Sequence, residues 1–149
     1  MSEATATPET RTREAEHLAD RYVALWNEPD RERRRRLIAE LWTEDGSQIL
    51  QPPQELREIA ARPGIGMAAT LEARGRAELE ARAATSYERW VGSDGLSFRR
   101  RDDVDRLHDV IKLHWEAVSP NGEVTAVGLN VLILATDGRI RRDYVFIES

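Results

Sequence analysis

Two dipeptides near the end of the chain constrain its fold more than any other feature. Asn121-Gly122 and Asp137-Gly138 are preferred in two-residue type I′ hairpin turns, in which both central residues need positive φ. They separate long stretches rich in β-branched and aromatic residues, over 107–118, 123–135 and 139–147. With a shorter strand over 96–100, the sequence predicts an antiparallel meander that closes the chain.

The preceding part of the 149-residue chain predicts helices. Apolar residues recur at helical spacing over 15–26 and again over 37–42, and Pro29 interrupts the pattern between them. We expect a third helix over 76–91, short strands over 47–51 and 70–74, and a short helix near 55–61 with a loop over 63–66. Residues 1–9 lack apolar periodicity and predict a disordered tail. Residues 10–149 predict a single α+β domain, with helices on one face of a curved antiparallel sheet.

Composition narrows the classes of function. The net charge of −5 argues against broad attraction to nucleic acid, and the absence of cysteine excludes disulfides, thiolate catalysis and Cys-ligated metals. The three histidines have no ligand spacing, so we expect no metal and no other cofactor. The arginine-rich run over 31–36 lies among acidic residues, which favours a solvated helix face over a nucleic-acid patch. No apolar run approaches the ~20 residues of a membrane span and no secretory signal is recognisable, so we expect a cytoplasmic protein without membrane contact.

The two turns also decide which side chains share a face of the sheet. If the dipeptides form the loops, Trp115 lies opposite Gly128 and Leu132 lies opposite Asp143. Counting residues outward from each of the two turns places the same side chains on one face of the sheet. This face is mostly apolar and should meet the helices: Asp109, Ile111, Leu113, Trp115, Ala117, Ala126, Gly128, Asn130, Leu132, Leu134, Arg141, Asp143, Val145 and Ile147.

Three polar residues interrupt this face: Asp109, Asn130 and Asp143. Burying a carboxylate costs several kcal/mol unless it is paired or hydrogen-bonded. The three residues therefore indicate either internal partners or a cavity with polar walls. Because Gly128 has no side chain to fill the space opposite Trp115, the cavity is the interpretation we favour.

The opposite face of the sheet carries an apolar patch: Val127, Leu129, Val131, Ile133, Tyr144 and Phe146. Monomeric proteins rarely expose such a patch to water. We expect a homodimer in which a two-fold axis joins the outer faces of two sheets.

Three segments carry a resemblance to a known family. Residues 22–27 (YVALWN) end the first helix, residues 41–46 (LWTEDG) end the second, and residues 137–140 (DGRI) form the last turn. In this layout the chain resembles the nuclear-transport-factor-2-like superfamily, and within it the SnoaL-like proteins of polyketide cyclase type, over about residues 13–148. The resemblance implies a cone-shaped α+β fold, in which about three helices pack on the concave face of a curved antiparallel sheet and enclose a pocket. Members include ketosteroid isomerase, scytalone dehydratase, limonene-epoxide hydrolase, polyketide cyclases and non-catalytic binding modules, so the fold alone does not choose a function.

The resemblance also suggests site residues. The general base of the isomerases matches Gln51, before Pro52, and a glutamine cannot take up a proton near neutral pH. The oxyanion donor of the isomerases matches Asn130, and the inward acidic residue on the last strand of SnoaL-like cyclases matches Asp143.

Each catalytic candidate has a structural alternative. Asp143 is expected to be a general acid or base, because an apolar environment raises a carboxyl pKa toward neutrality, or else to pair with Arg141 or another arginine. Asp109 is a second catalytic carboxylate or a partner in an ion pair at the rim. Asn130 is an oxyanion donor or a structural amide.

The candidate pocket is lined by residues of two kinds. Aromatic rings either form a slot for a flat ligand or belong to the core: Tyr22, Trp26, Trp42, Tyr87, Trp90 and Trp115. The other candidates are Gln51, Leu113, Gly128, Leu132 and Val145. The chain is therefore expected to be a cofactor-independent cyclase, isomerase or hydrolase of a small hydrophobic carbonyl compound. The alternative is a non-catalytic dimeric module that binds a small ligand or a protein segment.

Overall fold

The computed structural model describes residues 7–51, 58 and 71–148. Its elements along the chain are α1 (Pro8–Asn27), α2 (Arg31–Leu41), β1 (Trp42–Leu50), β2 (Leu71–Arg74), α4 (Gly75–Ser86), the π-helical η1 (Tyr87–Ser93), β3 (Ser97–Arg100), β4 (Asp105–Leu107), β5 (Val110–Val118), β6 (Val124–Leu134) and β7 (Ile140–Ile147). The expected tail lies outside this range over residues 1–6, as does the expected 55–61 helix and its loop apart from Glu58. In the described ranges, no helix is long and apolar enough to cross a membrane.

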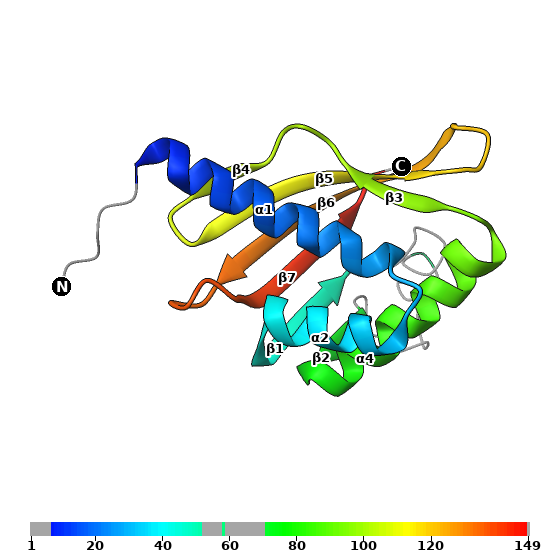
Figure 1. The fold of residues 1–149 in the computed structure, drawn as a ribbon, viewed down its shortest axis with the longest axis horizontal. Helices are drawn as coiled ribbons and strands as arrows, with labels where there is room; N and C mark the ends of the chain where they lie inside the picture. Colours follow the sequence, from blue (N-terminus) through cyan, green and yellow to red (C-terminus); the bar gives the residue numbers. More distant parts are fainter. Residues whose placement is uncertain (1–6, 52–57, 59–70, 149) are drawn as a thin grey trace.

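The strands form one curved sheet of seven strands in the order β2-β1-β7-β6-β5-β3, with β4 also paired to β5. The expectation of a wholly antiparallel sheet was wrong, because β1 runs parallel to β7. A parallel pair needs a long connection between its strands, and the chain from α4 to β6 supplies it. The helices α1, α2 and α4 cover one face, with α1 crossing the strands and α2 beside α4 (Figure 1). This is the expected α+β architecture.

The first two helices, α1 and α2, each begin after a residue whose side chain caps the helix. Thr7 accepts a hydrogen bond from the amide of Thr10 and starts α1 at Pro8, so the helix begins within the tail expected over residues 1–9. Asp30 accepts from the amide of Arg33 and starts α2. The second helix ends at Leu41, so Trp42 belongs to β1 rather than to the expected helix.

Two other expected elements are divided. The helix expected over 76–91 becomes α4 followed by η1. The strand expected over 107–118 is broken by a turn at His108 and Asp109 into β4 and β5. His108 is the one non-glycine residue of the described chain with positive φ, at 53°.

The register of the meander is as expected, although its turns are not. Trp115 pairs with Gly128, and Leu132 pairs with Asp143. Each loop has three residues rather than two, because the amide of Ser119 donates to Glu123 O and that of Ala135 donates to Arg139 O. Only the glycine of each dipeptide has positive φ, as in a type I turn followed by a bulge. A register shift beside each turn compensates for the extra loop residue, so the central pairs are unchanged.

Because of the register shift between β6 and β7, the first residues of β7 face the side opposite to the one expected. Ile140 is buried in the core and Arg141 is exposed, opposite to the expectation from simple alternation. From Asp143 onward the expected alternation holds, with Asp143 and Val145 buried. An ion pair between Asp143 and the exposed Arg141 is therefore excluded.

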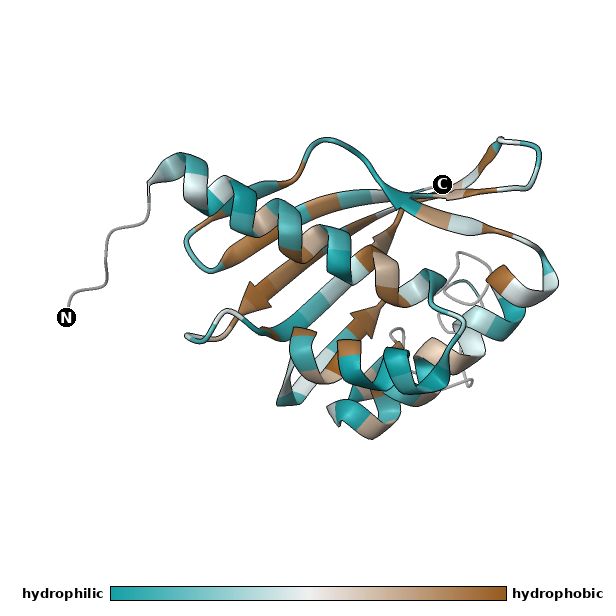
Figure 2. Cartoon of the chain, in the orientation of Figure 1, coloured by the Kyte–Doolittle hydropathy of each residue, from teal (hydrophilic) through white to brown (hydrophobic). Residues whose placement is uncertain are grey.

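The core lies between the helices and the sheet. Its fully buried members include Ile38, Leu41, Leu113 and Leu132. The central strands are predominantly hydrophobic, whereas the helices show long hydrophilic stretches on the side seen in Figure 2. The polar cluster described next is enclosed between these layers.

Candidate functional site

Four polar side chains from four elements meet inside the core: Tyr22 of α1, Gln48 of β1, Asn130 of β6 and Asp143 of β7. Asn130 and Asp143 are 0% exposed, Tyr22 is 3% exposed and Gln48 is 4% exposed. The sheet register brings them together, because Gln48 pairs with Asp143 across the parallel β1–β7 ladder. Asn130 pairs with Val145, the next inward residue of β7.

Asp143 accepts hydrogen bonds on both carboxylate oxygens. Tyr22 donates its hydroxyl hydrogen to Oδ2 at 2.5 Å, and the Gln48 amide donates to the same oxygen at 3.0 Å. The Asn130 amide donates to Oδ1 at 2.7 Å. The Tyr22 oxygen in turn accepts from the Gln48 amide at 3.1 Å and the Asn130 amide at 2.6 Å. The carboxylate is therefore surrounded by hydrogen-bond donors.

Two further side chains contact the outer ends of the amides. The indole N–H of Trp115 donates to Asn130 Oδ1 at 2.6 Å. The Arg82 guanidinium on α4 donates to Gln48 Oε1 at 3.0 Å and to the Gln48 carbonyl at 3.3 Å. Every polar side-chain atom of Gln48, Asn130 and Asp143 thus has a hydrogen-bond partner.

Burial governs the acid–base properties of the cluster. Loss of solvent raises the pKa of Asp143 from 3.8 to about 6, against the opposing effect of hydrogen bonds from Tyr22, Gln48 and Asn130 and of the Arg82 charge. Burial and the Asp143 charge raise the pKa of Tyr22 well above 10, so its hydroxyl stays protonated and remains a donor. Burial lowers the pKa of Arg82 below its ordinary value, although nearby Asp143 opposes this. Asp143 is the group in the cluster that changes protonation near neutral pH.

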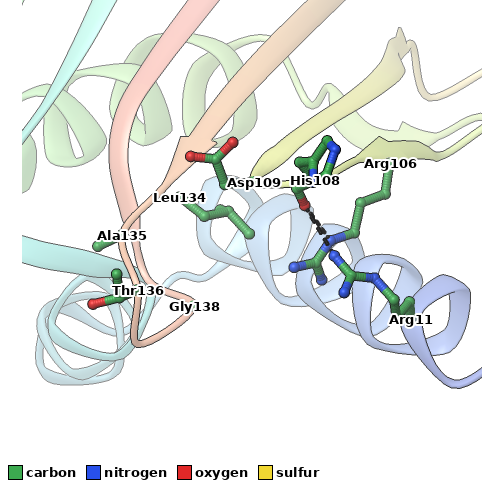
Figure 3. Close-up of a pocket in the computed structure, with 8 residues that line it drawn as sticks. All are labelled: Arg11, Arg106, His108, Asp109, Leu134, Ala135, Thr136 and Gly138. Atoms are coloured by element: carbon green, nitrogen blue, oxygen red, sulfur yellow. Dashed lines mark hydrogen bonds between the residues drawn. The ribbon is translucent and has the colours of Figure 1, made fainter. Parts of the chain in front are cut away.

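Asp109 does not join the other two catalytic candidates. It is exposed in the turn between β4 and β5 and lines a shallow cavity of about 470 Å³ with Arg11, Arg106, His108, Leu134, Ala135, Thr136 and Gly138. Arg11 and Arg106 both donate to the His108 carbonyl, while the Asp109 carboxylate points away from them (Figure 3). A second cavity of about 380 Å³ lies against α2 and α4, lined by Arg31, Arg34, Ala77, Glu80, Ala81, Ala84 and Glu88. Neither cavity is lined by Asp143 or Asn130.

The aromatic candidates divide into two groups. Trp42 and Trp26 pack on Tyr22, with ring centroids 5.7 and 5.9 Å away, and Trp115 contacts Asn130. Tyr87 instead packs under the Arg34 guanidinium, and exposed Trp90 packs under Arg89. The structure thus gathers four of the six rings around the polar cluster.

The remaining candidates surround the same region. Leu113, Leu132 and Val145 are buried near the cluster on the inward face of the sheet. Gln51 lies at the end of β1, where its Oε1 accepts from the amide of Ile147. The space expected above Gly128 is not empty, because a Cβ there would overlap the indole ring of Trp115.

Sequence reasoning missed Gln48, a member of the cluster, and Arg82, which contacts Gln48 from outside the cluster. Gln48 shares the inward face of β1 with Gly46, two residues earlier, and this alternation was a usable signal once the strand was extended backward from Ser47. Arg82 adjoins the buried Ala83 on α4, but nothing in the sequence links it to β1.

The fold of the chain is similar to those of several solved structures. It is similar to a candidate isomerase of the SnoaL-like family from Agrobacterium tumefaciens, at 24% identity and a TM-score of 0.73 over 92% of this chain and 99% of that chain. It is also similar to an NTF-2 like protein of unknown function from Silicibacter pomeroyi, at 14% identity and a TM-score of 0.56 over 96% and 100%. A third is SalBIII, an epoxide hydrolase/cyclase-like enzyme of pyran ring formation in salinomycin, at 14% identity and a TM-score of 0.58 over 92% and 92%. No protein-family model and no curated protein matches the sequence. The architecture and these likenesses show that the chain shares the fold of these SnoaL-like and NTF-2 like structures.

Proposed function

We propose that the chain is a cofactor-independent acid–base catalyst that acts on a small hydrophobic carbonyl compound, in a cyclase, isomerase or hydrolase type of reaction. The observation that carries this proposal is the buried Asp143 carboxyl, whose pKa of about 6 suits proton transfer at neutral pH. Its neighbours are neutral donors that favour negative charge on oxygen.

In the proposed reaction, ionised Asp143 removes a proton from the carbon next to the substrate carbonyl. The N–H donors of Asn130 and the hydroxyl of Tyr22 stabilise the enolate oxygen, and the Trp rings beside Tyr22 contact the apolar body of the substrate. Protonated Asp143 then returns the proton at a second position. Because Asp143 has no exposed surface in the described part of the chain, the cluster must open for the substrate to reach it.

A non-catalytic binding module is the second candidate, and a specific observation favours it. The polar side-chain atoms of Gln48, Asn130 and Asp143 are all partnered within the fold, as in a structural network that holds helices on a sheet. In that case the ligand is a small apolar molecule or a protein segment that does not contact Asp143.

Isotope exchange separates the two candidates. The protein is incubated in D2O with 2-tetralone, a flat hydrophobic ketone with acidic α-protons, and deuterium uptake is followed by NMR. We expect the wild type to accelerate exchange, and Asp143→Asn to reduce the acceleration by about 100-fold or more, since a positioned base contributes roughly that factor. Asp109→Asn is the matched control and should keep the wild-type rate, because Asp109 lies in an exposed turn.

The outcome of the exchange experiment decides against one candidate. An accelerated rate that survives in Asp143→Asn contradicts the role of Asp143. Tight binding of the ketone, seen as quenching of tryptophan fluorescence, without accelerated exchange supports the binding module.

We also propose that two copies of the chain associate through the outer face of the sheet, in the cytoplasm. Phe146 on this face is 44% exposed, and Val127, Leu129, Val131, Ile133 and Tyr144 are half-buried. Burying these side chains against a second copy removes a contiguous apolar patch from water.

A further inference from the structure

We propose that Arg82 and Trp115 are positioning residues, each of which holds one side-chain amide with its N–H donors toward Asp143 and Tyr22. The catalytic consequence of this positioning rests on the proposed acid–base function. The hydrogen bonds from which we infer it do not involve a substrate. Neither residue touches Asp143 by a hydrogen bond in the described structure, so each directs donors at the carboxylate through an amide. The Arg82 charge also lowers the pKa of Asp143 directly.

A side-chain amide has an oxygen end and a nitrogen end of nearly equal size, and it can present either end to a neighbour. Asn130 stands between Trp115 on one side and the Asp143–Tyr22 pair on the other. The indole N–H can only donate, so it requires the Asn130 oxygen on its own side. The Asn130 NH2 group is then directed at Asp143 Oδ1 and the Tyr22 oxygen, 2.7 and 2.6 Å away.

Arg82 does the same for Gln48 from the other side of the cluster. A guanidinium has donors only, and one Arg82 nitrogen contacts both the Gln48 Oε1 and the Gln48 backbone carbonyl. The backbone contact holds the guanidinium on β1 while the second contact selects the orientation of the amide. The Gln48 NH2 group is thereby directed at Asp143 Oδ2, 3.0 Å away.

The hydrogen bond from Trp115 to Asn130 also explains why a glycine, Gly128, lies opposite Trp115. The indole ring lies so close over residue 128 that any Cβ would overlap it, and only glycine lets the ring reach Asn130 from β5. Phe98 of β3 packs edge-on against the same indole, with centroids 5.6 Å apart. The ring is thus held on two sides in the position that its hydrogen bond needs.

The consequence concerns the proton affinity of Asp143. The groups that face it are Tyr22 of α1, Gln48 of β1 and Asn130 of β6, with the Arg82 charge of α4 behind Gln48 and Glu78 acting on Arg82. If either amide reverses, a carbonyl oxygen replaces an N–H donor beside the carboxylate. The carboxylate is then destabilised, the protonated acid gains an acceptor, and the pKa of Asp143 rises.

The test measures the pKa of Asp143 directly, by a pH titration of its 13C carboxyl signal in the full chain. We expect Trp115→Phe to raise the pKa of Asp143 by about 1, the effect of roughly one lost hydrogen bond to a charged group. Arg82→Met should raise it further, because the direct effect of the Arg82 charge is lost as well. Arg82→Lys retains a donor and a positive charge, and it should restore most of the wild-type value. Arg89→Met, which removes an arginine that packs on Trp90 at the surface, is the matched control and should leave the pKa unchanged.

The side-chain amide hydrogens of Gln48 and Asn130 provide a second readout that needs no substrate. Their exchange with solvent should accelerate for Asn130 in Trp115→Phe and for Gln48 in Arg82→Met. An unchanged Asp143 pKa and unchanged exchange in folded Arg82→Met overturn the proposal, even if Trp115→Phe fails to fold. A wild-type Asp143 pKa near 4 instead contradicts the acid–base function, and amide exchange still decides whether the two residues position the amides.

Discussion

Two opposing effects determine the pKa of Asp143. Burial favours the neutral carboxylic acid, whereas the donors of Tyr22, Gln48 and Asn130 favour the carboxylate. Because burial is the larger effect, the folded protein binds the Asp143 proton more tightly than the unfolded chain does. The residue therefore links folding stability to pH.

We expect this linkage to be measurable in the free energy of unfolding. The carboxyl stabilises the fold fully below pH 3.8, and this contribution is lost as the pH rises through about 6. The difference corresponds to about 3 kcal/mol. In Asp143→Asn, urea unfolding at pH 4 and pH 7 should show a loss of stability with rising pH that is smaller than in the wild type by about 2 kcal/mol, because part of the titration lies below pH 4. Asp109→Asn should keep the wild-type pH dependence, and an Asp143→Asn slope equal to wild type contradicts the raised pKa.

The same protonation governs the proposed activity. Ionised Asp143 is the base, so the rate of ketone exchange should rise with pH and level off above about 6. In Arg82→Met this rise should move to higher pH, following the pKa of Asp143. A rate independent of pH between 5 and 8 contradicts proton removal by Asp143.

Among the glycines that the structure describes, Gly128 has the least room for a side chain. We expect Gly128→Ala to destabilise the fold by about 1–3 kcal/mol, because the new Cβ displaces the Trp115 indole. The control is Gly92→Ala, where the nearest atom to a new Cβ is 3.5 Å away. Urea unfolding compares the two, and equal stability of both variants contradicts the close approach of the indole.

At the scale of elements, the two hairpins align the cluster. Each turn adds one loop residue and each neighbouring strand shifts by one, so that Asn130 and Asp143 both face the helices. The glycine at the end of each loop carries the positive φ that this geometry requires.

Substitution of Gly138 tests the conformation of the turn between β6 and β7. At φ of 86°, Gly138→Ala should cost about 1–2 kcal/mol of unfolding free energy, because a Cβ disfavours the left-handed region. Gly138→Asn should cost less, since asparagine adopts that region more readily. If the alanine variant is as stable as the wild type in thermal or urea unfolding, the loop does not have the described conformation.

At the scale of the whole molecule, the helices leave one face of the sheet uncovered in the described structure (Figure 1). On α2, Arg35 is exposed beside Glu80, as expected for a solvated, charged helix face. Arg34 departs from that expectation, because it is buried and donates to two backbone carbonyls. The outer face of the sheet carries the apolar patch at its centre and is the surface we assign to self-association.

We expect Val131→Glu to convert the proposed dimer into a monomer, because a carboxylate buried in an apolar interface is strongly unfavourable. Sedimentation velocity measures the change. Arg36→Glu places a carboxylate at an exposed position of α2, on the opposite side of the sheet, and serves as the control, which should remain dimeric. A dimeric Val131→Glu or a monomeric wild type contradicts this interface.

Much of the fold and part of the site follow from local patterns in the sequence. The 3.6-residue spacing of apolar residues and the turn dipeptides that end at Gly122 and Gly138 are local features. Side chains on a strand alternate with a period of two, so the central register followed from the turns. That is why Asn130 and Asp143 were placed on one inward face from the sequence.

The tertiary structure alone decided what surrounds Asp143. Gln48 joins the cluster through a parallel ladder between β1 and β7, strands about ninety positions apart, and Arg82 reaches it from a helix. No local pattern encodes such a pairing, because it depends on how the layers close on one another. Likewise the burial that moves the pKa of Asp143 is a property of the assembled layers, and it exists only when helices and sheet meet.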